Sequence, residues 1–366
     1  MFLLNSVLGY ILMLGPLVLL HELGHYLVGR WCGVHADAFS IGFGKEIFGW
    51  TDRSGTRWKV SWLPLGGYVK FAGDMTAASM PIDDIPLSLE ERERCFQFKP
   101  LWQRAAIVAA GPLTNLLIAL VIFAAFNLAF GRYVADPIVD AFPPHSAAQA
   151  AGMQVGDRIV AIDGGKTQYF DDVAMHVAPF PGQTVSVTVQ RAGGQLTLPV
   201  KLGAISQDDG KGHVSSYGQL GIQRGKGYAL RYGPIEAVGH AFQQCWNIVD
   251  LTVTGLRQII FGQRSVRELG GPIKIAGVAG EALTMGWLPF VSMAAFISIN
   301  LAFINLLPIP GLDGGHLAFY LVEAIRRKAL TARSQEWAFR TGFAFLLALI
   351  VFVTINDVVP ASLFGH

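Results

Sequence analysis

Four long apolar segments constrain the fold of this 366-residue chain more than any other feature. They span residues 2–28, 101–130, 287–307 and 337–359. A helix needs roughly 20 apolar residues to cross a bilayer, and it satisfies its own backbone hydrogen bonds in lipid. We therefore predict a polytopic α-helical membrane protein with about four transmembrane helices. No Lys or Arg precedes the first segment and no small-residue cleavage site follows it, which indicates a retained span rather than a cleaved signal peptide.

The composition describes a protein that is only partly embedded. Hydrophobic residues make up 52% of the chain and charged residues 15%, with a mean hydropathy of +0.42. A net charge of +2 without a long Lys/Arg cluster gives no basis for nucleic-acid binding. The three cysteines are odd in number, widely spaced and in no Cys-x-x-Cys arrangement, so we expect neither a disulfide framework nor a cysteine metal site.

Basic residues close to the membrane ends predict the topology. They lie between the first two spans and between the last two: Arg30, Arg92, Arg94, Lys99 and Arg104, then Arg326, Arg327, Lys328 and Arg333. Cytoplasmic connections carry such an excess, so both connections are expected in the cytoplasm. Both termini and the long 131–286 segment would then face the other side of the membrane. In a Gram-negative cell that side is the periplasm, and the protein would be a multi-pass protein of the bacterial inner membrane.

Residues 38–74 show the two-residue period of a β-hairpin instead of a helical pattern. Between residues 57 and 62, Arg, Lys and Ser alternate with Trp, Val and Trp, and a second short run follows Gly66 and Gly67. An apolar face with Trp50, Trp58 and Trp62 suits a membrane interface. The alternative is a cytosolic hairpin that packs on its own loop.

Residues 131–225 predict a mainly-β domain inserted between the membrane halves. Val alternates with polar residues from 184 to 190, and glycine-rich turns interrupt the pattern. Residues 146–164 resemble the helix, turn and strand of a bacterial PDZ domain, which can bind an extended peptide along a sheet edge or merely block access. Residues 226–286 are predicted as an amphipathic helical connector, with a helix from Pro234 to Phe261.

The first span ends in His21-Glu22-Leu23-Gly24-His25. Positions i and i+4 share one face of a helix, so His21 and His25 can point at one metal ion while Glu22 stands beside it as a base. Ionisable residues in an apolar run are expensive to insert and mark functional sites. This favours a zinc site over a pair of structural core histidines.

Catalytic zinc takes three protein ligands, so one more is required, and Asp313 is the best candidate. It follows the third span, where Pro308 and Pro310 must break the helix. Irregular backbone at membrane depth is tolerated where it is buried or lines a wet cavity. His316 is expected to support or cap this site, and Asn115 to hydrogen-bond to a neighbouring helix or the hairpin.

At this point the chain resembles the site-2 protease family of intramembrane zinc metalloproteases, in particular its bacterial RseP-like (regulator of sigma-E protease) branch. The resemblance covers nearly the whole chain and rests on six motifs: residues 21–25, 39–44, 64–69, 110–115, 271–273 and 305–314. It implies Zn²⁺ bound by His21, His25 and Asp313, with Glu22 as the catalytic base. It further implies that Asn305, Pro308 and Pro310 hold the substrate near the metal and that the hairpin at Gly66, Gly67 and Tyr68 pairs with it.

The resemblance implies a catalytic half at 1–130, a periplasmic PDZ domain at 131–225, and a second catalytic half at 287–366, with the active site near the cytoplasmic side. Expected substrates are single-span membrane proteins, such as an anti-sigma factor after a first cleavage, or signal-peptide remnants. One PDZ domain fits here, whereas well-known members carry two. The alternatives are a catalytically silent PDZ-bearing adaptor with a structural metal, for which Glu22 would have no use, and a transporter, for which no inverted repeat is evident.

Overall fold

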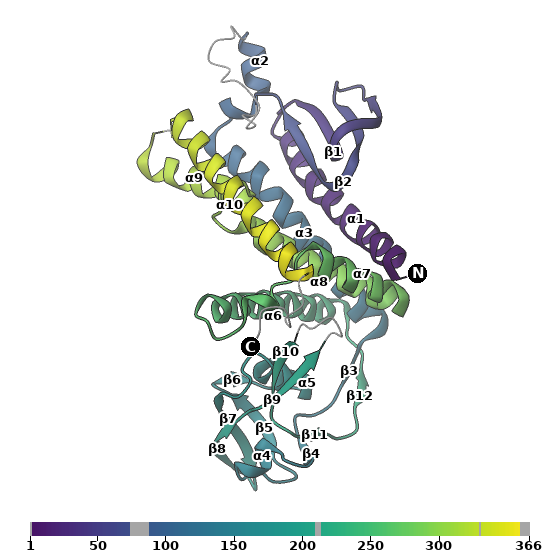
Figure 1. The fold of residues 1–366 in the computed structure, drawn as a ribbon, viewed down its shortest axis with the longest axis vertical. Helices are drawn as coiled ribbons and strands as arrows, with labels where there is room; N and C mark the ends of the chain where they lie inside the picture. The colour runs from purple at the N-terminus through teal and green to yellow at the C-terminus, as the bar shows by residue number, and fades with distance from the viewer. Residues whose placement is uncertain (1, 74–87, 209–213, 329–330, 359–366) are drawn as a thin grey trace. The chain divides into compact units, whose positions relative to one another are not determined.

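The computed structural model describes residues 2–73, 88–208, 214–328 and 331–358 (Figure 1). The chain divides into two compact units. The first unit comprises Met1–Phe123, Gln244–Val249 and Gly270–Val358, and the second, among the described residues, Ala124–Gln243 and Asp250–Leu269. Residue 74 of the predicted hairpin region and residues 359–366 of the predicted last region lie outside the described residues.

The predicted apolar spans are helices. In the described part of the chain, four helices are long and apolar enough to cross a membrane, namely α1 (Phe2–Trp31), α3 (Leu101–Phe130), α8 (Trp287–Leu306) and α10 (Ala332–Val358). Shorter helical elements accompany them in the first unit: α2 (Leu89–Arg94), η2 (Phe96–Phe98), α7 (Pro272–Met285) and α9 (Asp313–Arg326). The described residues therefore agree with the predicted number of spans.

Glycines allow the helices of the first unit to approach closely. A Cβ at Gly24 of α1 would lie 2.7 Å from the Ala110 carbonyl oxygen of α3. A Cβ at Gly9 would lie 2.7 Å from the Ala279 backbone of α7. Small residues are the usual means of helix packing in lipid, where apolar side chains gain little by moving inward. These two glycines therefore let α1 pack closely against both α3 and α7.

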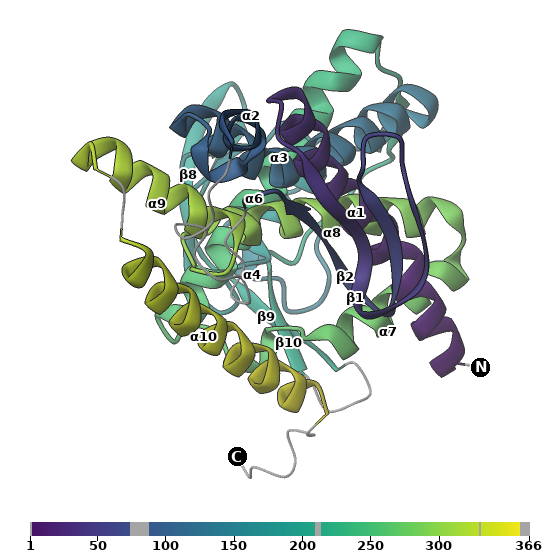
Figure 2. The same cartoon turned by 90° about the horizontal axis from the view of Figure 1, so that it is seen from above.

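Strands β1 (Ala36–Thr51) and β2 (Arg57–Phe71) form an antiparallel sheet beside α1 (Figure 2). Residues 38–41 of β1 pair with β2 twice, opposite residues 67–70 and opposite residues 57–60. A strand residue can pair with two neighbouring strand segments only if these lie on opposite sides of its own strand. Residues 67–70 are therefore an outer edge of the sheet, with no second strand partner among the described residues.

The predicted hairpin is present, but the prediction of one apolar face on its second strand was wrong. Trp58 packs as expected, stacked on Phe39 at 4.5 Å between ring centroids and edge-on to Tyr26 at 5.2 Å. Further along β2 the pattern reverses, since Ser61 is buried and Trp62 is 73% exposed. The double pairing explains the reversal, because β1 contacts β2 in more than one register.

The second unit is rich in short antiparallel strands. Its main sheet has the order β6-β5-β7-β8. Alternate residues of β7 are buried in a core of branched aliphatic side chains, which confirms the predicted alternation. The strands of this sheet are β5 (Arg158–Ile162), β6 (Gly165–Lys166), β7 (Thr184–Arg191) and β8 (Gly194–Lys201).

Among its described residues, three strand pairs, three α-helices and one short 3-10 helix complete the second unit. The pairs are β3 (Arg132–Val134) with β12 (Tyr228–Leu230), β4 (Val139–Ala141) with β11 (Gln223–Arg224), and β9 (Gly203–Asp208) with β10 (Val214–Gln219). The α-helices are α4 (Ala147–Ala150), α5 (Phe170–Val177) and α6 (Pro234–Ile260), and η3 (Val266–Glu268) follows α6. The helices predicted near residue 147 and from Pro234 are thus confirmed, and the middle of α6 groups with the first unit.

Candidate metal centre

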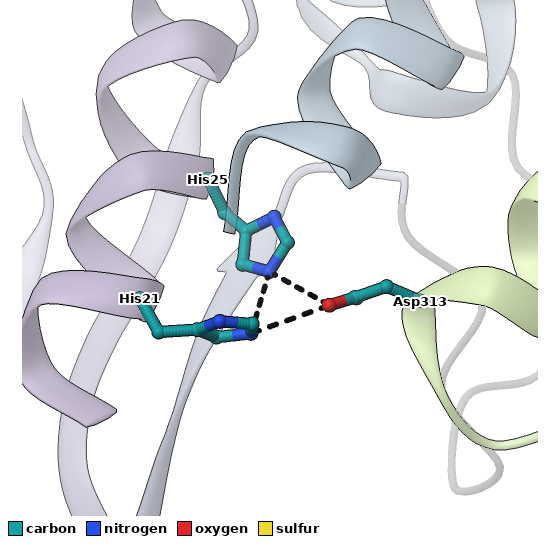
Figure 3. A group of neighbouring side chains, drawn as sticks. All are labelled: His21, His25 and Asp313. Atoms are coloured by element: carbon teal, nitrogen blue, oxygen red, sulfur yellow. Dashed lines mark hydrogen bonds and ion pairs between the residues drawn. The ribbon is translucent and has the colours of Figure 1, made fainter. Parts of the chain in front are cut away.

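Three side chains from two distant parts of the chain converge inside the first unit (Figure 3). His21 Nε2 lies 3.2 Å from Asp313 Oδ2, and His25 Nε2 lies 3.5 Å from the same oxygen. The two Nε2 atoms are 3.2 Å apart. Among the described residues, this is the group of His, Cys, Asp or Glu side chains that could hold a metal ion.

The two histidines lie one helical turn apart on α1. Both are largely enclosed, and their rings meet edge to face at 86° with centroids 4.8 Å apart. The i, i+4 spacing brings both rings to the same side of the helix, as the sequence predicted.

A backbone carbonyl of α3 orients His25. Its Nδ1 lies 2.8 Å from the Ile107 carbonyl oxygen. A carbonyl only accepts, so Nδ1 carries the hydrogen and Nε2 presents its lone pair to Asp313. Pro112 lies inside the same helix and has no backbone N–H, so the carbonyl of Val108, next to Ile107, has no i+4 donor.

Gly111 of α3 leaves space for both imidazoles, a role that sequence reasoning missed. A Cβ at this position would overlap His25 Nε2 and lie 2.8 Å from His21 Cε1. Gly111 belongs to one of the motifs that carried the family resemblance, but composition and periodicity gave no reason for a glycine there. Only the packing of α3 on the two rings supplies it.

Asn115 contacts the other histidine. Its side-chain amide Nδ2 lies 3.3 Å from His21 Nδ1, and its backbone carbonyl accepts a 2.8 Å hydrogen bond from Ser298 of α8. The predicted hydrogen bond from Asn115 to a neighbouring helix is therefore confirmed. The sequence did not indicate that the partner is His21 itself.

Asp313 is the first residue of α9 and follows the helix break that the two prolines predicted. α8 ends at Leu306, and the intervening backbone folds directly onto α9. A Cβ at Gly314 would overlap the Leu306 carbonyl oxygen, and one at Gly315 would lie 2.8 Å from the Ile309 carbonyl carbon. The two glycines after Asp313 thus let the loop pack against the helix that carries the carboxylate.

The surroundings of Asp313 keep it ionised. Burial opposes the charged form, but the close approach of the His21 and His25 imidazoles outweighs it and holds the pKa of Asp313 well below its usual range. Its place at the start of α9 also favours negative charge through the helix dipole. A carboxylate, and not a carboxylic acid, therefore faces the two histidines.

Glu22 lies between the histidines and the outer edge of the sheet. Its carboxylate accepts a hydrogen bond from the Val69 backbone N–H. A Cβ at Gly67 would lie 3.1 Å from Glu22 Cγ and 2.8 Å from the Ser40 carbonyl oxygen. The strand edge at residues 67–70 is consequently adjacent to the predicted base.

The other residues predicted to hold a substrate surround this centre less directly. Asn305 lies in the last turn of α8 and is half-buried, with no hydrogen bond to the three converging side chains among the described residues. Pro308 and Pro310 lie in the loop before Asp313. Gly66 packs against the Phe43 ring, and Tyr68 stacks on the same ring with centroids 6.0 Å apart. Their contact with a substrate stays a prediction.

His316 lies one turn after Asp313 and outside the converging group. Its ring packs against Phe339 of α10 at 4.7 Å between centroids. Burial lowers the pKa of His316, which favours the neutral imidazole. His316 thus links the helix turn that carries Asp313 to α10 through its contact with Phe339.

The geometry of the converging atoms fits a tetrahedral zinc ion. Bonds of about 2.0–2.1 Å at tetrahedral angles place neighbouring ligand atoms roughly 3.3 Å apart. The three separations here are 3.2, 3.2 and 3.5 Å. Two imidazoles and one carboxylate leave a fourth position for water or substrate, as catalytic zinc sites require.

Known proteins resemble this chain along nearly its whole length. The model of peptidase family M50 matches residues 9–349. A "Putative zinc metalloprotease" of Agrobacterium fabrum is 44% identical, with 100% of this chain and 98% of the relative covered. "Metalloprotease MmpA" of Caulobacter vibrioides is 34% identical, with 96% of each chain covered.

Proposed function

Because the chain belongs to peptidase family M50, we propose that it is a membrane-embedded zinc endopeptidase that cuts single-span membrane proteins within or near the bilayer. The observation that carries this proposal is the approach of His21, His25 and Asp313 to within 3.5 Å of one another. Two relatives whose names include metalloprotease support the same activity, and the name of the Agrobacterium fabrum relative supports the choice of zinc.

His21, His25 and Asp313 would hold the ion, and Glu22 would act as the base. Zinc, when bound, lowers the pKa of a coordinated water and polarises a peptide carbonyl. Glu22 takes a proton from the attacking water and delivers it to the leaving amine. The Val69 N–H holds the Glu22 carboxylate beside the histidines during both transfers.

The outer edge of β2 supports a way to present the substrate. A peptide bond in a transmembrane helix is tied to the residue four positions on, so the substrate must unwind before attack. Unwinding in lipid leaves backbone groups without partners, at several kcal/mol each. Residues 67–70 form an outer strand edge next to Glu22. The Val69 N–H is engaged by Glu22, and a substrate strand added along this edge would recover bonds to its other backbone groups.

Exposed apolar side chains support a membrane setting for the first unit. Only 6% of the most apolar stretch of α10 is buried. The β1–β2 sheet also exposes large apolar side chains that suit an interface: Phe43, Ile47, Phe48, Trp50 and Trp62. With the basic connections in the cytoplasm, the protein would reside in a bacterial inner membrane with the centre near the cytoplasmic side.

The second unit would supply the periplasmic part of a single-PDZ member of the RseP-like branch. Its residues 131–225 would bind a peptide or restrict access by size. Substrates would be anti-sigma factors already cut outside the membrane, or signal-peptide remnants.

Glu22→Gln tests the proposal. The amide keeps the shape of Glu22 but cannot act as a base. The variant should retain zinc, measured by elemental analysis of the purified protein, and should lose cleavage of a single-span model substrate by at least about 100-fold. Cleavage at the wild-type rate would refute the mechanism, and a wild-type protein without zinc would refute the proposal itself.

A further inference from the structure

Asn115 is the most deeply buried polar side chain in contact with the candidate centre. It is 1% exposed, and its amide lies 3.3 Å from His21 Nδ1. Its amide oxygen Oδ1 is also buried and has no hydrogen-bond partner among the described residues. A buried acceptor without a donor is costly and requires an explanation.

The two histidines provide that explanation when they are compared. His25 donates from Nδ1 to the Ile107 carbonyl, which leaves Nε2 free to bind a metal. If His21 is to bind the same ion through Nε2, its single hydrogen must also reside on Nδ1 and must meet an acceptor. With Asn115 Nδ2 facing Nδ1, His21 would carry its hydrogen on Nε2, toward His25 and Asp313.

A half-turn of the Asn115 amide gives Oδ1 a donor at His21 and places Nδ2 where Oδ1 lay. The rotation exchanges Oδ1 and Nδ2 with almost no change in shape. Oδ1 then faces His21 Nδ1 at hydrogen-bond distance and gains a donor. The Nε2 lone pair of His21 turns toward the same point as that of His25.

We propose that Asn115 is a positioning residue that accepts a hydrogen bond from His21 Nδ1–H and thereby commits His21 Nε2 to the zinc ion. The proposal rests on the proposed function, because it requires a metal at this centre. The Ser298 hydroxyl donates to the Asn115 backbone carbonyl, a contact between α8 and α3 that does not involve the side-chain amide.

Substitutions of Asn115 distinguish its role as a hydrogen-bond acceptor from a role as a side chain that only fills space. Asn115→Asp keeps an acceptor and should bind zinc within about threefold of the wild type, whereas Asn115→Leu removes it and should bind roughly 10- to 100-fold more weakly. Asn115→Ala removes the amide without added bulk and should show the same loss. Zinc affinity is measured by competition with a chelator, and the absorption spectrum of the cobalt-substituted protein should change in the Leu and Ala variants but not in Asp.

Two controls test for a purely structural effect. Ser298→Ala removes a hydrogen bond to the same residue but leaves the amide in place. Asn127→Leu makes the same replacement at another buried position of α3. Both should keep wild-type zinc affinity and the wild-type cobalt spectrum.

The outcomes distinguish this proposal from the proposed function. Wild-type affinity in Asn115→Ala, or equal losses in the Asp and Ala variants, would overturn the role of Asn115 while the zinc site stands. If the wild-type protein itself binds no zinc, the proposed function fails and this inference fails with it.

Discussion

In the second unit the interior is filled by branched aliphatic side chains such as Ile159 and Val187, whereas around the candidate centre of the first unit it holds His21, Asn115 and Ser298. The first unit meanwhile exposes many of its large apolar side chains along α1 and α10. The difference reflects two surroundings. In water, burial of apolar surface drives packing, while in lipid close approach and hydrogen bonds decide it. Substitutions that add atoms at the helix contacts should therefore disrupt the first unit. Substitutions that remove atoms from the aliphatic core should instead destabilise the second unit.

Gly111→Val should have the largest effect. The new side chain would overlap His25 and press on His21, so the two imidazoles could no longer face one point. Zinc affinity should fall by at least about 100-fold, measured by chelator competition, and cleavage should be lost. Gly15→Val is the matched control, because a Cβ at Gly15 meets nothing within 4 Å. Normal zinc binding by Gly111→Val would show that α3 does not press on the rings.

Val187→Ala tests the opposite rule in the second unit. Val187 is fully buried in the core of the main sheet, so the loss of two methyl groups leaves a cavity. The second unit should lose about 2 kcal/mol of stability, seen as roughly 30-fold less protection of β7 amides in hydrogen exchange. Zinc affinity should stay unchanged. Ser186→Ala, on the exposed face of the same strand, is the control, and equal protection in both variants would contradict the comparison.

Gly342→Ala tests the added-atom rule on the aspartate side of the centre. A Cβ at Gly342 of α10 would overlap the Pro310 carbonyl oxygen and lie 2.6 Å from its carbon. Pro310 is in the loop before Asp313, which can shift more easily than a packed helix. We expect zinc affinity to fall by about tenfold, less than for Gly111→Val. Gly255→Ala, where a Cβ meets nothing within 4 Å, should have no effect, and an unaffected Gly342→Ala would show that α10 does not support this loop.

The two sides of the centre also differ in how far the sequence predicts them. The i, i+4 spacing of His21 and His25 fixes their common face because a helix has a regular repeat. Asp313 could be selected from the broken helix before it and the need for a third ligand. Its approach to the histidines depends instead on an irregular loop and on the two following glycines, which no local pattern encodes.

The hairpin shows the same limit in a different form. Alternation predicted the strand, but alternation assumes one partner in one register. Residues 38–41 pair twice, which reverses the inward face between Trp58 and Ser61. The supporting roles of Gly111 and Asn115 were likewise beyond the sequence alone, because both depend on contacts between helices more than 80 residues apart.

The smallest predicted effect is a pH-dependent one in the second unit, where a charged pair takes part in an otherwise aliphatic interior. Asp157 is almost fully buried and accepts two 2.7 Å hydrogen bonds from Arg191, which hold the pKa of its carboxyl below the ordinary value. Because the pKa is lower in the folded state, the carboxylate stabilises the fold above the ordinary pKa of about 3.9, and this contribution is lost as the pH falls through the folded-state value.

Asp157→Asn keeps the shape but removes the charge, and should destabilise the second unit by about 1 kcal/mol at pH 7. The difference from the wild type should shrink as the pH falls below about 4, as measured by hydrogen exchange of the intact protein in micelles. Asp136→Asn is the control, since its 3.4 Å pair with Arg158 is half-exposed and should contribute little at either pH. A difference that grows in acid would mean that the fold favours the protonated form of Asp157 over the carboxylate, which would contradict the lowered pKa and the stabilising role of the pair with Arg191.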